Sequence, residues 1–98
     1  MAQVTVEITG AIWRIRPTEK VGRDQRFNRK FFIRELNAKY PEVWGMEMWH
    51  DNTMLLNEYK ESDYVKCKCV VRGRQWTNRN GMDDSIIVLQ CIEITKLS

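Results

Sequence analysis

The sequence predicts an all-β fold, a five-stranded barrel with one short α-helix between the third and fourth strands. Three observations predict it: segments in which apolar and polar residues alternate, turn signals between them, and a glycine inside the first alternating segment. The chain has 98 residues, of which 43% are hydrophobic, enough to build one core but not two. We therefore expect a single domain over residues 1–98.

The first strand lies near the N-terminus. Apolar residues occupy every second position from Val4 to Ile8, and the alternation resumes after Gly10 as far as Ile15. A glycine inside a strand is typical of a bulge or a sharp bend, which a barrel needs where one strand serves two parts of its sheet. Residues 18–28 then carry many charges and few apolar side chains, so we expect a loop there.

The second strand is expected over Phe31–Leu36, and its buried face has two alternatives. If Phe32 points into the core, Phe31 is exposed and becomes a candidate for stacking on a base. In the other register Phe31 and Ile33 point inward and Phe32 points outward. Both registers stay open at this stage.

The third strand, Val43–Trp49, precedes the helix. Asp51 or Asn52 can cap a helix over Asn52–Tyr59, because their side-chain oxygens accept hydrogen bonds from the free amides of a first turn. The core side of the strand is expected to hold Trp44, Met46 and Met48, and the outer side Val43, Gly45, Glu47 and Trp49.

The fourth and fifth strands form a long hairpin. The fourth is expected over Tyr64–Trp76 and the fifth over Ile86–Leu97, and Asn80-Gly81 is a turn signal between them. One face of the fourth strand is apolar and the other is cationic: Val65, Cys67, Cys69 and Val71 point inward, and Lys66, Lys68, Arg72 and Arg74 point outward.

This order of elements describes the five-stranded OB-fold barrel. In that fold the ligand crosses the second and third strands, between the loop that follows the first strand and the loop that follows the fourth. Both of these loops coincide with basic parts of the chain.

The charge is strongly polarised along the chain. Arg14–Lys30 has seven basic and two acidic residues, and Tyr64–Met82 has five basic residues and no acidic one. Phe31–Asp63, between them, has three basic and seven acidic residues, so the net charge of +3 conceals two cationic stretches. Cations interleaved with aromatic rings suit a single-stranded nucleic acid, whose phosphates need positive charge and whose unstacked bases need flat apolar faces.

The candidate site therefore combines basic and aromatic side chains in or beside these stretches with Trp49 on the outer face of the third strand. The alternative for each is an ordinary solvated or packing role. The candidate nucleic-acid-binding residues are Arg16, Lys20, Arg23, Arg26, Arg29, Phe31, Trp49, Lys66, Lys68, Arg72, Arg74, Trp76 and Arg79.

Four short motifs, in this order and spacing, carry a resemblance that spans nearly the whole chain. They are Phe27–Phe32, Tyr40-Pro41, Asp51–Leu56 and Val71–Trp76. With them the sequence resembles a family of small bacterial and phage OB-fold proteins of unknown function, similar in fold to single-stranded DNA-binding proteins. Cellular proteins of that kind bind partners through an acidic tail, whereas this sequence ends in Ile94–Ser98, so we do not expect recruitment through such a tail.

These observations predict a single-stranded DNA-binding protein that coats and protects exposed strands in replication or recombination without sequence preference. Two alternatives remain: an OB protein that binds single-stranded RNA, and an OB module that binds another protein. Replication or recombination proteins and a second copy of the chain, in a homo-oligomer, are further candidate partners. A membrane is not a candidate partner, because the longest apolar runs span only a few residues.

We expect no catalysis, no metal and no cofactor. His50 is the single histidine and suits a capping or surface role, and Cys67 with Cys69 on one apolar face is poor spacing for metal ligands. With three cysteines, an odd number, the sequence favours reduced core thiols over disulfides. The expected location is the bacterial cytoplasm, including that of an infected host.

Overall fold

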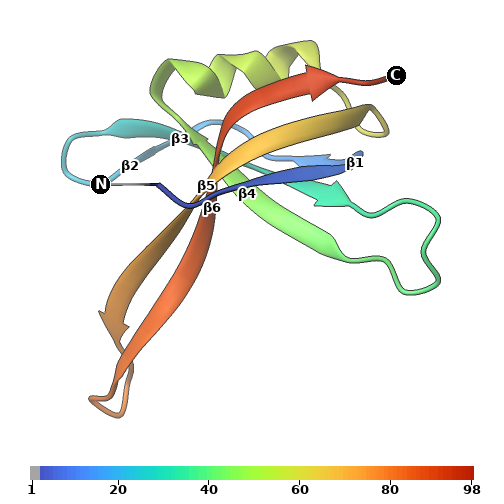
Figure 1. Cartoon of the computed structure of the whole chain (residues 1–98). Helices are drawn as coiled ribbons and strands as arrows, with labels where there is room; N and C mark the ends of the chain where they lie inside the picture. Colours follow the sequence, from blue (N-terminus) through green and yellow to red (C-terminus); the bar gives the residue numbers. More distant parts are fainter. Residues whose placement is uncertain (1–2) are drawn as a thin grey trace.

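The computed structural model describes residues 3–98 as a closed ring of strands with a helix at one end (Figure 1). The neighbours in the sheet follow the order β1-β5-β6-β4-β3-β2, and an additional β1–β3 pairing closes the ring. This confirms the expected barrel. The elements are β1 (Thr5–Ile15), β2 (Glu19–Val21), β3 (Arg26–Arg34), β4 (Val43–Trp49), the helix η1 (His50–Glu58), β5 (Tyr64–Thr77) and β6 (Asp83–Lys96).

The bend of β1 is what allows the ring to close. Residues 5–11 pair with β5, and residues 11–15 pair with β3, with a bulge in β1 between Ile12 and Arg14. Gly10 is buried at the bend, where a Cβ atom would lie 2.5 Å from the carbonyl oxygen of Arg34. The strand can turn from one partner to the other because this position has no side chain.

The core lies inside the ring and fixes the register of β3. Phe31 and Ile33 are fully buried there, and Phe32 points to the outer face and is half-buried. The expectation of an exposed Phe31 is therefore wrong: Phe31 lies opposite Met46 on β4 and is inaccessible to a base. The buried core residues are Ile12, Phe31, Ile33, Met46, Met48, Leu56, Val65, Cys67, Cys69 and Cys91.

The helix η1 is a 3-10 helix rather than an α-helix, and it begins two residues earlier than expected. No side chain caps its N-terminus, so the predicted caps Asp51 and Asn52 are wrong. Thr53 and Leu56 are buried and Tyr59, just beyond the helix, is half-buried, a spacing that matches three residues per turn. This face covers one end of the ring.

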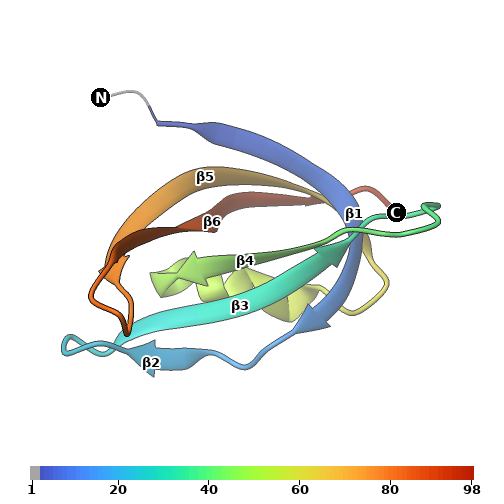
Figure 2. The same ribbon diagram turned by 90° about the horizontal axis from the view of Figure 1, so that it is seen from below.

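The charged segment after β1 is not a plain loop. Its residues Glu19–Val21 form β2, which pairs with Arg26–Asn28 at the start of β3. Gly22 at φ +75° and Gln25 at φ 53° make the turn between them. The resulting β2–β3 hairpin leaves the barrel on the same side as the much longer hairpin formed by β5 and β6, and the two diverge toward their tips (Figures 1 and 2).

Among residues 3–98, no helix is both long enough and apolar enough to cross a lipid bilayer.

Candidate nucleic-acid interface

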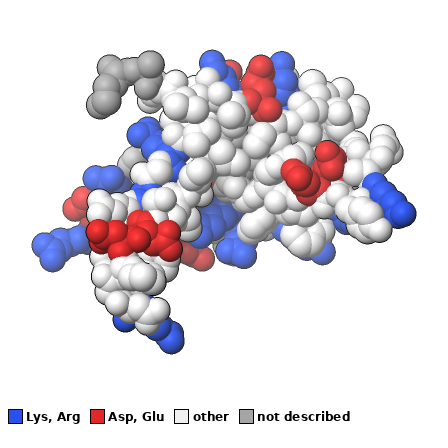
Figure 3. Space-filling model, turned by 60° about the horizontal axis from the view of Figure 1, so that its bottom comes forward, with Lys and Arg blue, Asp and Glu red and all other residues white. Residues whose placement is uncertain are grey.

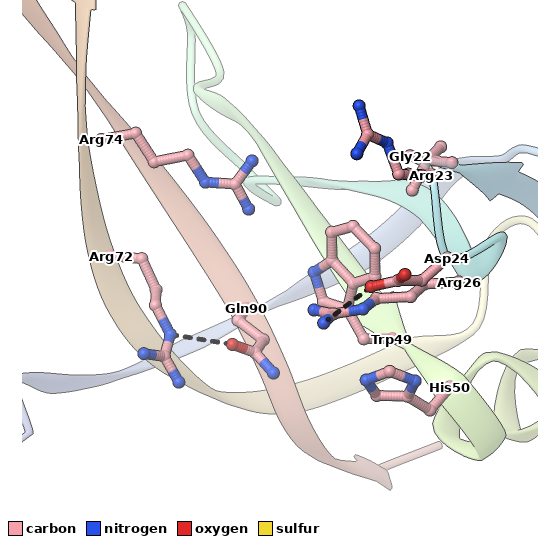
Figure 4. Close-up of a pocket in the computed structure, with 10 residues that line it drawn as sticks. Gly22, Arg23, Asp24, Arg26, Trp49, His50, Arg72, Arg74 and Gln90 are labelled. Carbon is pink, nitrogen blue, oxygen red and sulfur yellow. Dashed lines mark hydrogen bonds and ion pairs between the residues drawn. The ribbon is translucent and has the colours of Figure 1, made fainter.

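An open pocket of about 520 Å³ lies between the β2–β3 hairpin and the β5–β6 hairpin. Arg23 and Arg26 enter it from the first cationic stretch, and Arg72 and Arg74 enter it from the second. Trp49 and His50 also line it, on the same side as Arg26 and across from Arg72 and Arg74 (Figure 4). The fold therefore brings the two cationic stretches of the sequence onto one site.

The strand geometry explains why these arginines face the pocket. Arg72 and Arg74 are two residues apart on β5, and side chains at that spacing share one face of a strand.

The far end of the hairpin is fixed by Asn78, whose side-chain oxygen accepts hydrogen bonds from the backbone amides of Asn80 and Met82, at 2.9 and 3.1 Å. The Asn80-Gly81 turn is confirmed, with Gly81 at φ +79°.

The four pocket arginines are not electrostatically equivalent. Arg26 lies 3.4 Å from Asp24, and Arg74 lies 3.3 Å from the buried Glu47. Arg72 instead donates from Nε to the neutral amide oxygen of Gln90 at 2.9 Å. Within residues 3–98, Arg23 and Arg72 form no ion pair, so their charges remain available to a phosphate.

Of the aromatic rings on and near the two hairpins, Trp49 lines this pocket, whereas Trp76 and Phe27 lie outside both it and the second pocket described below. The half-buried Trp49 donates its indole N–H to Glu47 at 2.9 Å, and this bond fixes the direction of the ring. Trp76, near the far end of β5, is 49% exposed, which disfavours a role in sealing the barrel. Phe27 is exposed on the β2–β3 hairpin, with the Lys20 ammonium 5.9 Å from the centre of its ring.

A second pocket, of about 330 Å³, continues the site along the outer face of β3 and β4. It is lined by Phe32, Lys30 and Arg16, and the Arg16 guanidinium lies 5.0 Å from the centre of the Phe32 ring. Gly45 lies opposite Phe32, where a Cβ atom would come within 3.1 Å of the ring. The ring can lie close against β4 because Gly45 leaves that space.

Three further residues on this face, Lys30, Phe32 and Trp13, were not among the candidate site residues predicted from the sequence. Lys30 and Phe32 line the second pocket, and Trp13 meets Phe32 edge to face with ring centres 6.2 Å apart. The register that buries Ile33 already turns Phe32 outward, and this was the available signal. Trp13 is 37% exposed because the bulge in β1 falls at its position.

Two predicted cations lie elsewhere. Lys66 forms an ion pair with Glu7 at 3.6 Å, and Lys68 lines a shallow pocket with Glu7 and Glu93. Strands β1 and β6 supply these acidic neighbours, which the sequence of β5 alone does not contain. The structure therefore does not bring Lys66 and Lys68 into the pocket of Arg72.

Arg29 has a structural role. Its guanidinium donates to the carbonyl oxygens of Arg16 at 2.8 Å and Thr53 at 3.2 Å, and to the side-chain oxygen of Asn57 at 2.7 Å. It thereby connects β3 to η1, and we exclude it from the site. Arg79 is exposed in the turn between β5 and β6, outside both pockets.

The surface view shows how charged side chains are distributed around the projecting hairpin. Lys and Arg side chains lie around the base of the projecting hairpin and at its tip, and a group of acidic side chains lies across the hairpin itself (Figure 3).

The three cysteines are free and buried, as expected of core thiols. A hydrogen bond with Cys91 and burial raise the pKa of Cys69, and a hydrogen bond with Cys67 is the largest cause of a raised pKa at Cys91. Burial also raises the pKa of Tyr59. Among residues 3–98, no three His, Cys, Asp or Glu side chains lie close enough together to hold a metal ion.

Solved structures share this fold. A mitochondrial single-stranded DNA-binding protein from S. cerevisiae, Rim1, superimposes with a TM-score of 0.79 at 14% sequence identity, over 99% of this chain and 97% of that one. The SSB domain of a Synechococcus sp. protein gives a TM-score of 0.70 at 10% identity, over 96% of each chain. At such identities the likeness establishes the OB fold alone.

No curated protein matches the sequence significantly. A family profile does match, over residues 7–90, and its description is "Domain of unknown function (DUF3127)". This range covers most of the strands and both pockets. The chain therefore belongs to the DUF3127 family, whose fold in this member is that of the single-stranded DNA-binding OB proteins.

Proposed function

We propose that the protein binds single-stranded DNA without sequence preference, coating exposed strands in replication or recombination and catalysing no reaction on them. The observation that carries this proposal is the pocket in which Arg23 and Arg26 meet Arg72 and Arg74 around Trp49. Solved structures of similar fold, which are those of mitochondrial single-stranded DNA-binding proteins from S. cerevisiae, support it. The proposed setting is the cytoplasm of a bacterium, including one infected by a phage.

The geometry favours a single strand over a duplex. The arginines of the pocket can neutralise phosphates of the strand. The counterions that these phosphates then release favour binding. Trp49 lines the pocket together with the four arginines, and Phe32 lines the second pocket, so a base must leave its stack to reach either ring. In a duplex the bases stay paired and stacked, whereas in a single strand they are free to stack on aromatic side chains.

Titration with oligo-dT, followed by tryptophan fluorescence at several salt concentrations, tests the proposal. Arg72→Ala should weaken binding and reduce the slope of log affinity against log salt by roughly 0.7, the value for one phosphate on a single strand. Lys60→Ala is the charge-matched control, because Lys60 is exposed in the turn after η1, outside both pockets. Equal effects of the two substitutions would contradict a localised site.

Competition between oligo-dT and oligo-U of equal length separates DNA from RNA. Stacking and phosphate contacts do not by themselves distinguish the sugars, so preference for oligo-U would favour the RNA-binding alternative. Recovery of intact oligonucleotide after prolonged incubation would support a binding protein without nuclease activity.

A further inference from the structure

Glu47 is a buried carboxylate on the outer face of β4, beneath the β5–β6 hairpin. It is 7% exposed and lies where β4 meets β6, opposite Gln90. Three side chains donate to it: Asn28 at 3.2 Å, Trp49 at 2.9 Å and Arg74 at 3.3 Å. A buried charge is costly unless it is paired and hydrogen-bonded, so these donors and the carboxylate depend on one another.

The first consequence concerns Arg74. Its side chain is 54% exposed at the pocket, but its charge is compensated by Glu47 directly behind it. Arg72, on the same face of β5, is held by the neutral Gln90, so no carboxylate compensates its charge. A neutral pair attracts a phosphate less than a free guanidinium does, so the two arginines differ in their contribution to binding.

The second consequence concerns Trp49. An indole has one hydrogen-bond donor, its N–H, and no acceptor. In Trp49 this donor is occupied by Glu47, which leaves only the face of the ring for a base. Stacking on a ring face is tolerant of sequence because every base has such a face.

We propose that Glu47 is a positioning residue of this site: it neutralises Arg74 and aims Trp49, so that Arg72 rather than Arg74 binds a phosphate and Trp49 contacts bases through its ring face alone. The inference rests on the proposed function and deepens it. It explains how one carboxylate in a cationic site makes binding insensitive to base identity.

The variant that tests it is Glu47→Gln, titrated with oligo-dT over a range of salt. Freed from the carboxylate, Arg74 gains a phosphate contact, and the salt slope should become steeper by roughly 0.7. The double variant Glu47→Gln/Arg74→Ala should return the slope to the wild-type value. Glu58→Gln, an exposed position at the end of η1, removes the same charge at a distance and should leave the slope unchanged.

Two outcomes separate this inference from the proposed function. Wild-type protein that fails to bind oligo-dT would overturn the proposed function and the inference with it. Wild-type binding combined with an unchanged slope in Glu47→Gln, measured where circular dichroism shows the variant folded, would overturn the inference alone.

Hydrogen exchange of the indole N–H groups provides a measurement that needs neither DNA nor a folded Glu47 variant. The wild-type protein has four tryptophans, and substitution of each by Phe assigns the signals. The N–H of Trp49 should exchange at least tenfold more slowly than that of Trp76, which is 49% exposed. Equal exchange rates would overturn the role of Glu47 in holding Trp49.

Discussion

At the scale of single residues, Trp76 combines high exposure with a position on β5 two residues beyond Arg74. Replacement by Ala should cost about 1–3 kcal/mol of binding free energy, the usual value of one stacked base. The salt slope should stay unchanged, because a stacked ring releases no counterion. Titration of Trp76→Ala with oligo-dT at several salt concentrations measures both quantities.

The matched control is Trp76→Phe, which keeps an aromatic face and should retain most of the affinity. Thermal unfolding is measured alongside, since a ring that is 49% exposed contributes little to the core. A large fall in melting temperature with normal binding by the folded fraction would assign Trp76 to packing instead.

Phe31 and Phe32 show what the sequence leaves undecided at this scale. Two adjacent aromatic residues fit a strand in either register, and a slip of one residue exchanges their faces. The pairing of Phe31 with Met46, and of Phe32 with Gly45, resolves the choice. Such contacts across strands are absent from the local pattern, so an exposed Phe31 and an exposed Phe32 were equally consistent with it.

At the scale of elements, Arg29 links β3 to η1, and its loss should destabilise the fold rather than the site. A hydrogen bond from a charged group contributes roughly 1.5–3 kcal/mol, so Arg29→Ala should lower the free energy of unfolding by about 2 kcal/mol. Urea unfolding measures this change. The folded variant should bind oligo-dT with the wild-type salt slope.

Lys30, the next residue along β3, is the matched control because it is exposed in the second pocket. Lys30→Ala should leave stability nearly unchanged and make the salt slope shallower by roughly 0.7. The reverse pattern, with Arg29 controlling the slope, would place Arg29 back in the site.

The bend of β1 depends on Gly10. In Gly10→Ala the new Cβ atom would lie 2.5 Å from the carbonyl oxygen of Arg34 and 2.8 Å from a methyl group of Ile33. Overpacking of this kind costs roughly 1–3 kcal/mol, which urea unfolding would show as a lower midpoint. Gly73→Ala is the control, because no atom lies within 4 Å of its added Cβ, and its midpoint should hardly change.

The alternation of apolar and polar residues predicted the strands that bury one full face. It missed β2 and did not give the type of η1. The long strands and the bend at Gly10 followed from alternation and one glycine. In β2 only Val21 is half-buried, and the strand is held by its pairing with β3. It therefore has no alternating apolar pattern from which it could be predicted. The helix η1 was assigned the wrong type because Leu55 and Leu56 suit either helix, and only the buried Thr53 reveals the spacing of three.

At the scale of the whole molecule, the fold converts an uneven distribution of charge along the chain into one cationic site. The net charge is only +3, yet Arg23, Arg26, Arg72 and Arg74 share one pocket. Sequence could predict this meeting once the order of strands was known, because the two loops flank the same face of an OB barrel. It could not predict that Glu7 and Glu93 surround Lys68, or that Glu47 pairs with Arg74.

This concentration of charge predicts how binding depends on salt. If about four to six phosphates are neutralised, the slope of log affinity against log salt should be roughly −3 to −4 on a single strand. Duplex DNA of the same sequence should bind more weakly at every salt concentration, because its paired bases cannot reach Trp49 or Phe32. Fluorescence titrations with both ligands measure the slopes and the difference in affinity. Equal affinity for duplex and single strand would mean that charge alone holds the ligand, and the aromatic rings would then have no part in binding.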